Sequence, residues 1–266
     1  MARVFQTRDS IVSRVATADQ VREYWNRHIH DLEITRHPVG SRGFFADLDE
    51  YHFEKLHHLL RLVDFDGACG RRVLEVGCGA GVDLARFAKG GATVTGVDLA
   101  KSAIDLARTN FEQQGLRGAF QVADGEALPF PNGSFDLVYA HGVVQYTVDP
   151  QRLVNECHRV LAPGGDAIFQ VYNRRSWLHA LSKLMKVGLE HEDAPVILKF
   201  SIDEFRLMLS PFREVRIVPE RFPVKSRLHR GWKGVLYNSV FVGAFNALPR
   251  RIVRRFGWHL LAFCKR

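Results

Sequence analysis

Residues 72–100 read RVLEVGCGAGVDLARFAKGGATVTGVDLA, and this stretch decides the fold. A short β-branched run leads into closely spaced glycines, a pattern typical of a strand that turns sharply into a helix. The helical spacing that follows ends at two glycines, and a second strand-like run, residues 92–99, comes next. The pattern predicts a strand, a glycine loop, a helix and a second strand.

The same alternation continues along the chain. We expect further strands at residues 119–124, 135–140, 166–173, 212–222 and 257–266, and helices at residues 101–115 and 149–161. Asp149 suits the N-cap of the second of these helices, with Pro150 at its first position. Strands that alternate with helices of this length predict an α/β fold with a doubly wound, mostly parallel sheet of seven strands.

The composition places the chain among globular proteins. It has 266 residues, of which 46% are hydrophobic and 25% charged. The four cysteines form no CxxC pair, so neither a disulfide framework nor a structural zinc site is expected. The amino-terminal residues lack the apolar core of a signal peptide, and no apolar run reaches the length of a membrane span. We therefore expect a cytoplasmic protein.

Three regions differ in character. Residues 1–68 are polar and helical, with a second helix expected at about 47–63, and are interpreted as an N-terminal lid over a substrate pocket. Residues 69–173 contain the regular alternation and form the expected ligand-binding core. Residues 174–266 form a basic region whose helical inserts complete the sheet.

The positive charge is concentrated near the carboxyl terminus. The chain carries +8 overall, but residues 213–266 hold 13 Lys and Arg against two Glu. The apolar run VLYNSVFVGAFNAL, residues 235–248, precedes Arg250, Arg251, Arg254 and Arg255. Two interpretations stay open: a peripheral anchor on an anionic membrane at its inner face, or a pocket cover whose charges are solvated. RNA binding is disfavoured, since no recognised RNA module accompanies the arginines.

The glycine loop points to a particular kind of ligand. Gly77, Gly79 and Gly81 form G-x-G-x-G, and Val82 stands where a dinucleotide loop has its third glycine. This departure argues against an NAD-dependent dehydrogenase. Asp98 ends the second strand, where a carboxylate can accept hydrogen bonds from both ribose hydroxyls. The pattern predicts a nucleoside ligand without phosphates.

Four motifs in order resemble the class I S-adenosylmethionine-dependent methyltransferases. They are VLEVGCGAG (73–81), VTGVDLA (94–100), ADGEALPFPNGSFDLVYA (123–140) and RVLAPGGDAIFQ (159–170). The third is similar to the small-molecule branch, which includes quinone and menaquinone-type enzymes. The resemblance covers about residues 70–172. It implies a Rossmann-like methyltransferase fold, S-adenosyl-L-methionine as cofactor, and methyl transfer (EC 2.1.1.-) to a small-molecule or lipid-like acceptor.

The resemblance also implies a cofactor site. Its expected residues are Glu75, Gly77, Cys78, Gly79, Asp98, Leu99, Asp124, Gly125 and His141. Glu75 would orient the loop and reach the ligand's amino group, or would only cap backbone amides. Asp124 would accept from the adenine amino group, or would only form a turn. Cys78 is interpreted as a small filler rather than a nucleophile.

A general base is needed only if the acceptor atom must lose a proton. The catalytic candidates are His141, which the resemblance places between the methionine end and the acceptor, and Tyr146. Many relatives have a histidine where this chain has Tyr146, so the resemblance does not fix the acceptor-side chemistry. His141 could equally be structural.

Other aromatic residues and histidines have two interpretations each. Tyr24 and Trp25 could close over the sulfonium or anchor the first helix in the core. His52, His57 and His58 stand among charged residues, and a solvated helix face is the favoured interpretation. No metal site is expected, because no carboxylate lies at a spacing that would complete one.

Two further functions remain as alternatives. A non-catalytic S-adenosylmethionine-binding module, tethered to a membrane or a partner, would keep the same glycine loop. A nucleic-acid base as acceptor is disfavoured, because AHGV at residues 140–143 replaces the D/N-P-P-Y/F motif of such enzymes. The sequence does not predict the oligomeric state.

Overall fold

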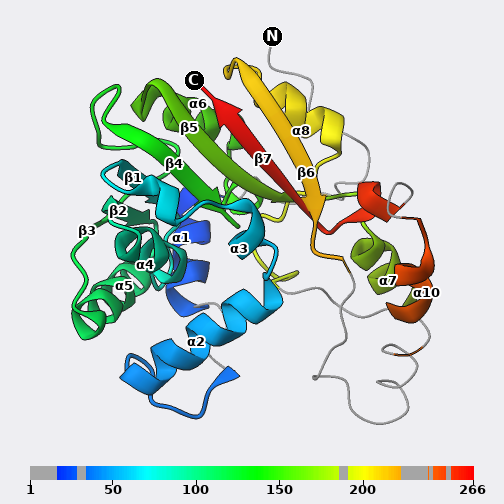
Figure 1. Cartoon of the computed structure of the whole chain (residues 1–266), viewed down its shortest axis with the longest axis horizontal. Coiled ribbons are helices and arrows are strands. Elements are labelled where there is room, and N and C mark those ends of the chain that lie inside the picture. The colour runs from blue at the N-terminus through cyan, green and yellow to red at the C-terminus, as the bar shows by residue number, and fades with distance from the viewer. Residues whose placement is uncertain (1–16, 29–33, 186–190, 223–238, 240–241, 250–252) are drawn as a thin grey trace.

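A seven-stranded sheet forms the centre of the molecule, in the order β3-β2-β1-β4-β5-β7-β6 (Figure 1). The computed structural model describes residues 17–28, 34–185, 191–222, 239, 242–249 and 253–266. The strands are β1 (Arg72–Val76), β2 (Thr93–Asp98), β3 (Ala119–Val122), β4 (Phe135–His141), β5 (Leu161–Tyr172), β6 (Glu214–Glu220) and β7 (His259–Lys265). Only β7 runs antiparallel to its neighbours, so the predicted doubly wound α/β sheet is confirmed.

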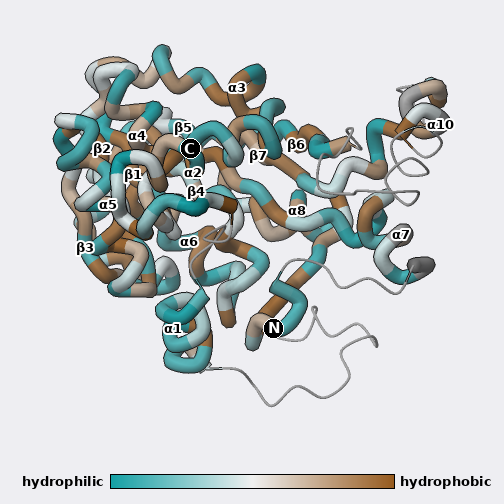
Figure 2. Tube along the Cα trace, turned by 90° about the horizontal axis from the view of Figure 1, so that it is seen from below, coloured by the Kyte–Doolittle hydropathy of each residue, from teal (hydrophilic) through white to brown (hydrophobic). Residues whose placement is uncertain are grey.

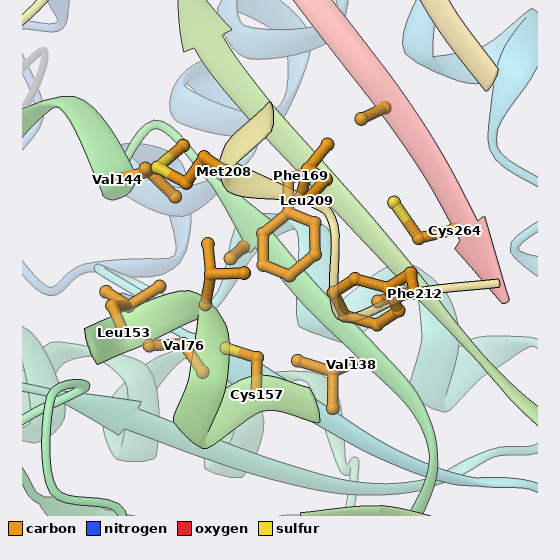
Figure 3. Close-up of a cluster of buried hydrophobic side chains, with 14 of the residues drawn as sticks. Val76, Val138, Val144, Leu153, Cys157, Phe169, Met208, Leu209, Phe212 and Cys264 are labelled. Carbon is orange, nitrogen blue, oxygen red and sulfur yellow. The ribbon is translucent and has the colours of Figure 1, made fainter. Parts of the chain in front are cut away.

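Helices cover both faces of the sheet. The helices that cross between strands or flank them are α4 (Val82–Lys89), α5 (Lys101–Gln114), α6 (Pro150–Val160) and α8 (Ile202–Met208). Alternate residues of each buried strand point to opposite faces. Accordingly, Leu74 belongs to the buried cluster that includes residues of α6 and α8, while its neighbour Val73 belongs to the cluster that includes residues of α4. Figure 3 shows the first of these clusters, where Leu153 and Cys157 of α6 meet Phe169 of β5.

Local signals fix several helix ends. Asp149 accepts a hydrogen bond from the backbone N–H of Arg152, with Pro150 in the first turn, as predicted. Ser201 and Glu204 form a capping box at the start of α8. The last two predicted strands also form, as β6 and β7.

The predicted helix at 47–63 is wrong in its bounds. The chain forms α2 (Arg42–Lys55) and a separate short helix α3 (Leu59–Leu62). Ser41 starts α2 early, because its side chain accepts from the backbone N–H of Phe44. The helix stops at Leu56, whose φ of −118° and ψ of 35° leave the helical region.

The remaining elements flank this core. They are α1 (Ala18–Arg27), η2 (Asp66–Ala68), η3 (Val144–Tyr146), α7 (Trp177–Met185), α10 (Val242–Ala247) and η5 (Arg254–Phe256). Helices α7 and α10 lie beyond the β6 and β7 side of the sheet, far from β3 (Figures 1 and 2). Figure 2 shows apolar residues along the strands and a mostly hydrophilic α1. Within the described residues, no helix combines the length and the apolar character that a membrane crossing needs.

The expected membrane anchor lies partly outside the described residues. Arg250 and Arg251 fall there, as do residues 235–238 of the apolar run. Arg254 and Arg255 are described and exposed. His30 of the predicted lid also lies outside the described residues.

Candidate active site

A pocket opens where the carboxyl ends of β1, β2 and β4 meet, and the glycine loop forms its floor. Gly77 has a φ of +71°, in the left-handed region, and a Cβ there would lie 2.1 Å from Cγ2 of Val143. The backbone N–H groups of Gly77 and Cys78 both donate to the carbonyl of Val97, which ties the loop to β2. Close approach and backbone conformation therefore both require glycine at position 77.

Asp98 stands at the end of β2 and lines the pocket. Its two carboxylate oxygens accept from the backbone N–H groups of Gly79 (3.0 Å) and Ala100 (2.9 Å). Burial raises the pKa of Asp98, and these backbone donors oppose the shift. Each carboxylate oxygen can accept a further hydrogen bond, so the residue can both hold the loop and receive two ribose hydroxyls.

Glu75 lies beneath the loop on β1 and is 3% exposed. Burial raises its pKa well above the ordinary value, and the charges of Asp83 and Asp98 raise it further. The backbone N–H of Leu84 donates to its carboxyl group, while Oε2 has no partner among the described residues. The carboxyl group thus supports the loop and also lines the pocket.

The remaining predicted cofactor residues also border the pocket: Cys78, Leu99, Asp124, Gly125 and His141. Asp124 Oδ1 accepts from the backbone N–H of Glu126 at 2.9 Å, so it does form a turn. Cys78 is buried, and burial raises the pKa of its thiol well above the ordinary value. A protonated, enclosed thiol fits the interpretation of Cys78 as a filler.

A buried carboxylate that no sequence motif indicated also lines the pocket, directly after the glycine loop. Asp83, in the first turn of α4, is 4% exposed and lines the pocket. Its Oδ1 lies 2.9 Å from Nε2 of His52, and its Oδ2 accepts from the hydroxyl of Tyr139 at 3.1 Å. Nδ1 of His141 lies 3.4 Å from the same Oδ2. Three donors from α2 and β4 therefore surround one buried carboxylate.

This network sets the protonation of His141. Burial alone would raise the pKa of Asp83, but His52 and His141 outweigh it and the pKa is lowered. For His141, burial lowers the pKa although Asp83 opposes the shift. Nε2 of His141 is buried and has no partner among the described residues. With Nδ1 turned to Asp83, a neutral imidazole can offer the lone pair of Nε2 to the pocket.

The same three side chains have the spacing of a possible metal site. One ligand atom each from His52, Asp83 and His141 lies within 4.8 Å of the others. Hydrogen bonds among these residues and Tyr139 already satisfy Asp83 without an ion. The absence of a metal site stays a prediction.

The solvated face predicted for the three lid histidines is wrong for two of them. His57 is exposed, but His58 is 1% exposed, and His52 contacts Asp83. The helix ends at Leu56, so His58 turns inward beside His259 of β7, with ring centroids 5.7 Å apart. The partner carboxylate, Asp83, comes from a distant segment, which is why local spacing gave no sign of it.

Aromatic side chains close the far end of the pocket. The hydroxyl of Tyr146, the second catalytic candidate, lies 2.9 Å from that of Tyr172, and both residues line the pocket. Trp25 of α1 packs edge-on against Tyr146, with centroids 4.9 Å apart, and also lines the pocket. Tyr24 instead donates to Asp193 at 2.8 Å and is not a lining residue. Of the two predicted lid aromatics, only Trp25 reaches the site.

Comparisons with known proteins agree with this architecture. A family described as a methyltransferase domain matches residues 74–169. A ubiquinone biosynthesis O-methyltransferase of Coxiella burnetii is 40% identical over 124 residues, which cover 46% of this chain and 51% of that protein. The chain thus spans about half the length of the first curated relatives it matches.

The match to a second relative covers a larger share of both proteins. The ubiquinone biosynthesis O-methyltransferase of Escherichia coli O9:H4 (strain HS) is 34% identical over 176 residues, which cover 62% of this chain and 70% of that protein. Among solved structures, a complex of the Haloferax volcanii Trm112 methyltransferase activator with a putative methyltransferase matches with a TM-score of 0.59 and 19% identity. That match covers 85% of this chain and 95% of the other, and it shows the fold alone.

Proposed function

The chain belongs to the class I S-adenosylmethionine-dependent methyltransferases, and we propose that it transfers a methyl group from S-adenosylmethionine to a hydroxyl oxygen of a small or lipid-like acceptor. Relatives named for ubiquinone biosynthesis favour an intermediate of that pathway as the acceptor. The observation that carries the proposal is the position of His141. Its unpartnered Nε2 is buried in the pocket wall, and its Nδ1 lies beside Asp83.

The residues divide into two groups by task. Asp98 would hold the ribose, Asp124 and Gly125 the adenine, and the loop at Gly77 and Gly79 the methionine part. Methyl transfer from a sulfonium is an in-line displacement, so positioning both partners supplies much of the acceleration. The acceptor would lie on the side of His141, Trp25 and Tyr146, all of which line the pocket.

His141 would act as the general base. Its neutral Nε2 takes the proton of the acceptor hydroxyl while the oxygen attacks the methyl carbon. The oxygen–carbon bond forms, the sulfur–carbon bond breaks, and S-adenosylhomocysteine leaves with the bonding pair on sulfur. Asp83 would act as a positioning residue, because it fixes the tautomer and stabilises the imidazolium that forms.

Turnover of a panel of catechols and hydroquinones, with methyl-deuterated S-adenosylmethionine, tests the proposal by mass spectrometry of the product. We expect a labelled O-methyl ether and S-adenosylhomocysteine in equal amounts. His141→Gln and Asp83→Asn should each lower kcat about 100-fold or more, with the alkaline rise of the pH profile lost or displaced. Tyr139→Phe is the matched control, because it removes one hydrogen bond to Asp83 but keeps both histidines.

Two results would contradict the proposal. Binding of S-adenosylmethionine without release of any methylated product would favour the non-catalytic module instead. An activity that a chelator abolishes and a divalent ion restores would assign His52, Asp83 and His141 to a metal, rather than to proton transfer.

A further inference from the structure

Arg221, a residue of the pocket lining, has a strained backbone conformation. Directly after β6, its φ is +57°, in the left-handed region that residues other than glycine, asparagine and aspartate rarely adopt. Two hydrogen bonds hold this conformation: the carbonyl of Arg221 accepts from Nε1 of Trp177 (3.0 Å) and from the backbone N–H of Trp258 (3.3 Å). Strained residues fixed in this way gather at ligand sites.

The side chain of Arg221 lines the pocket. One guanidinium nitrogen lies 3.1 Å from Nε2 of His259, and because arginine can only donate, that nitrogen of His259 accepts. Four further N–H donors of the guanidinium remain for other partners. Nδ1 of His259 therefore carries the proton, and it has no partner among the described residues.

The carboxylate next to Arg221 in the sequence has another partner. Glu220 accepts a hydrogen bond from Arg61 at 2.8 Å. Among the described residues, no carboxylate forms an ion pair with Arg221.

The histidines around Arg221 do not neutralise it either. Burial lowers the pKa of His58 to about 3, and it also lowers the pKa of His259 and His141. The charge of Arg221 lowers all three further, so these rings are neutral at pH 7. The positive charge of Arg221 is thus not offset by these rings.

A half-buried cation without a counter-charge is costly, and an anionic ligand offsets that cost. We infer that Arg221 anchors an oxyanion, a carboxylate or a phosphate, carried by the methyl acceptor. The inference rests on the proposed function and adds the substrate class. Arginine suits this task, because its planar fork can donate two parallel hydrogen bonds to such a group. The aromatic rings of Trp25, Tyr146 and Tyr172 would contact the body of the same acceptor.

Calorimetric titration of the full chain, saturated with S-adenosylhomocysteine and at low salt, tests the inference. The probes are benzoate, phenyl phosphate and the neutral benzamide. We expect at least one anionic probe to bind about 10-fold or more tightly than benzamide, and the stronger of the two identifies the oxyanion. No binding of either anion to the native chain, or equal binding of benzamide, would overturn the inference.

Variants of Arg221 test whether its guanidinium group binds the anion. Arg221→Asn removes the charge but tolerates the left-handed backbone, so the fold is kept. We expect it to weaken the preferred anion about 10- to 100-fold, and Arg221→Lys to weaken it less. Arg216→Asn is the matched control on β6, because Arg216 lies over the ring of Phe263 and does not line the pocket. Native-like anion affinity in Arg221→Asn would refute the assignment.

The affinity for S-adenosylhomocysteine, measured on the same samples, separates the two proposals. If the native chain fails to bind it, the proposed function fails. If the native chain binds it but neither anion, only the role of Arg221 fails.

Discussion

The cofactor half and the acceptor half of the pocket differ in how far apart in the sequence their residues lie. Glu75, Gly77 and Asp98 fall within 24 residues, on two adjacent parallel strands and the loop between them. The acceptor half joins His52 of α2, His141 of β4, Arg221 after β6 and His259 of β7. These cofactor residues belong to one local stretch, whereas the acceptor half forms only once the whole sheet and helix α2 have formed.

The two halves also differ in chemistry. Backbone amides and carboxylates line the cofactor half, and these groups belong to three short motifs at residues 73–81, 94–100 and 123–140. His141, His259 and Arg221 line the acceptor half, and burial lowers the pKa of both of these histidines. A substitution in the cofactor half should therefore affect cofactor binding directly. A substitution in the acceptor half should change the protonation of its histidines and the binding of the acceptor.

The largest expected effect comes from Gly77→Ala. The new Cβ would lie 2.1 Å from Cγ2 of Val143, and the φ of +71° disfavours any side chain. Strain of about 1–2 kcal/mol and an overlap costing about 1–3 kcal/mol should displace the loop. We expect the affinity for S-adenosylhomocysteine to fall more than about 100-fold by calorimetry.

Gly70→Ala is the matched control for this change. Its φ is +75°, but nothing lies within 4 Å of the added Cβ, and the residue is not part of the pocket lining. It should cost about 1–2 kcal/mol of stability and leave cofactor affinity unchanged. Equal cofactor affinity in the two variants would show that the close approach to Val143 has no role.

Asp98→Asn should have a smaller effect on the same half. It removes the charge that would receive the ribose hydroxyls, and its amide group meets backbone donors from Gly79 or Ala100. We expect the dissociation constant of S-adenosylhomocysteine to rise about 10- to 100-fold, as for hydrogen bonds to a charged group. Asp105→Asn, an exposed acid on α5, is the control, and an unchanged constant in Asp98→Asn would refute the ribose assignment.

The smallest expected effect concerns the acid sensitivity of His58, which packs beside His259 of the acceptor half. His58 has a pKa of about 3 in the folded chain, below its ordinary value of 6.5. The unfolded chain therefore binds more protons between these values, so stability is full above pH 6.5 and falls as the pH drops toward 3. The loss is at most about 1.4 kcal/mol per pH unit, or about 2–4 °C in Tm.

His58→Leu should remove this part of the acid sensitivity. Both ring nitrogens of His58 are buried without partners among the described residues, so an apolar side chain should cost little at pH 7. We expect Tm to fall less between pH 6.5 and 5.5 in His58→Leu than in the native chain. His57→Leu, at the exposed neighbouring position, should keep the native slope. Parallel slopes in all three proteins would show that His58 binds its proton equally well in the folded and the unfolded chain.

Sequence patterns predicted most of the fold, because its signals are local. Glycine loops, strand runs and the Asp149–Pro150 cap each act within a few residues. The strands form near the expected positions, although β5 begins at Leu161, five residues before the expected strand. The helix at 47–63 was misplaced, because Ser41 was not recognised as an N-cap ahead of Phe44. The apolar spacing beyond Leu56 resembled a continuing helix, although the backbone turns there.

The sequence likewise predicted one part of the site and missed another. All of the expected cofactor residues, together with His141 and Tyr146, border one pocket. Asp83 was missed, because an acid in the first turn of a helix ordinarily complements the helix dipole. Its spacing of four residues from the buried Phe87 was the one available signal that it faces inward. Arg221 and His259 gave no local signal, since their meeting depends on the pairing of β6 with β7.

The reversed direction of β7 has a consequence for how acceptor range could diversify. Because β7 runs against its neighbours, its first residue, His259, pairs with Tyr172 and Glu220, the last residues of β5 and β6. The segment from Arg221 to Trp258 thus leaves and rejoins the sheet at the acceptor wall. Substitutions at this junction, where Tyr172, Arg221 and His259 line the pocket, would reshape the acceptor wall without changing a strand register or the cofactor motif.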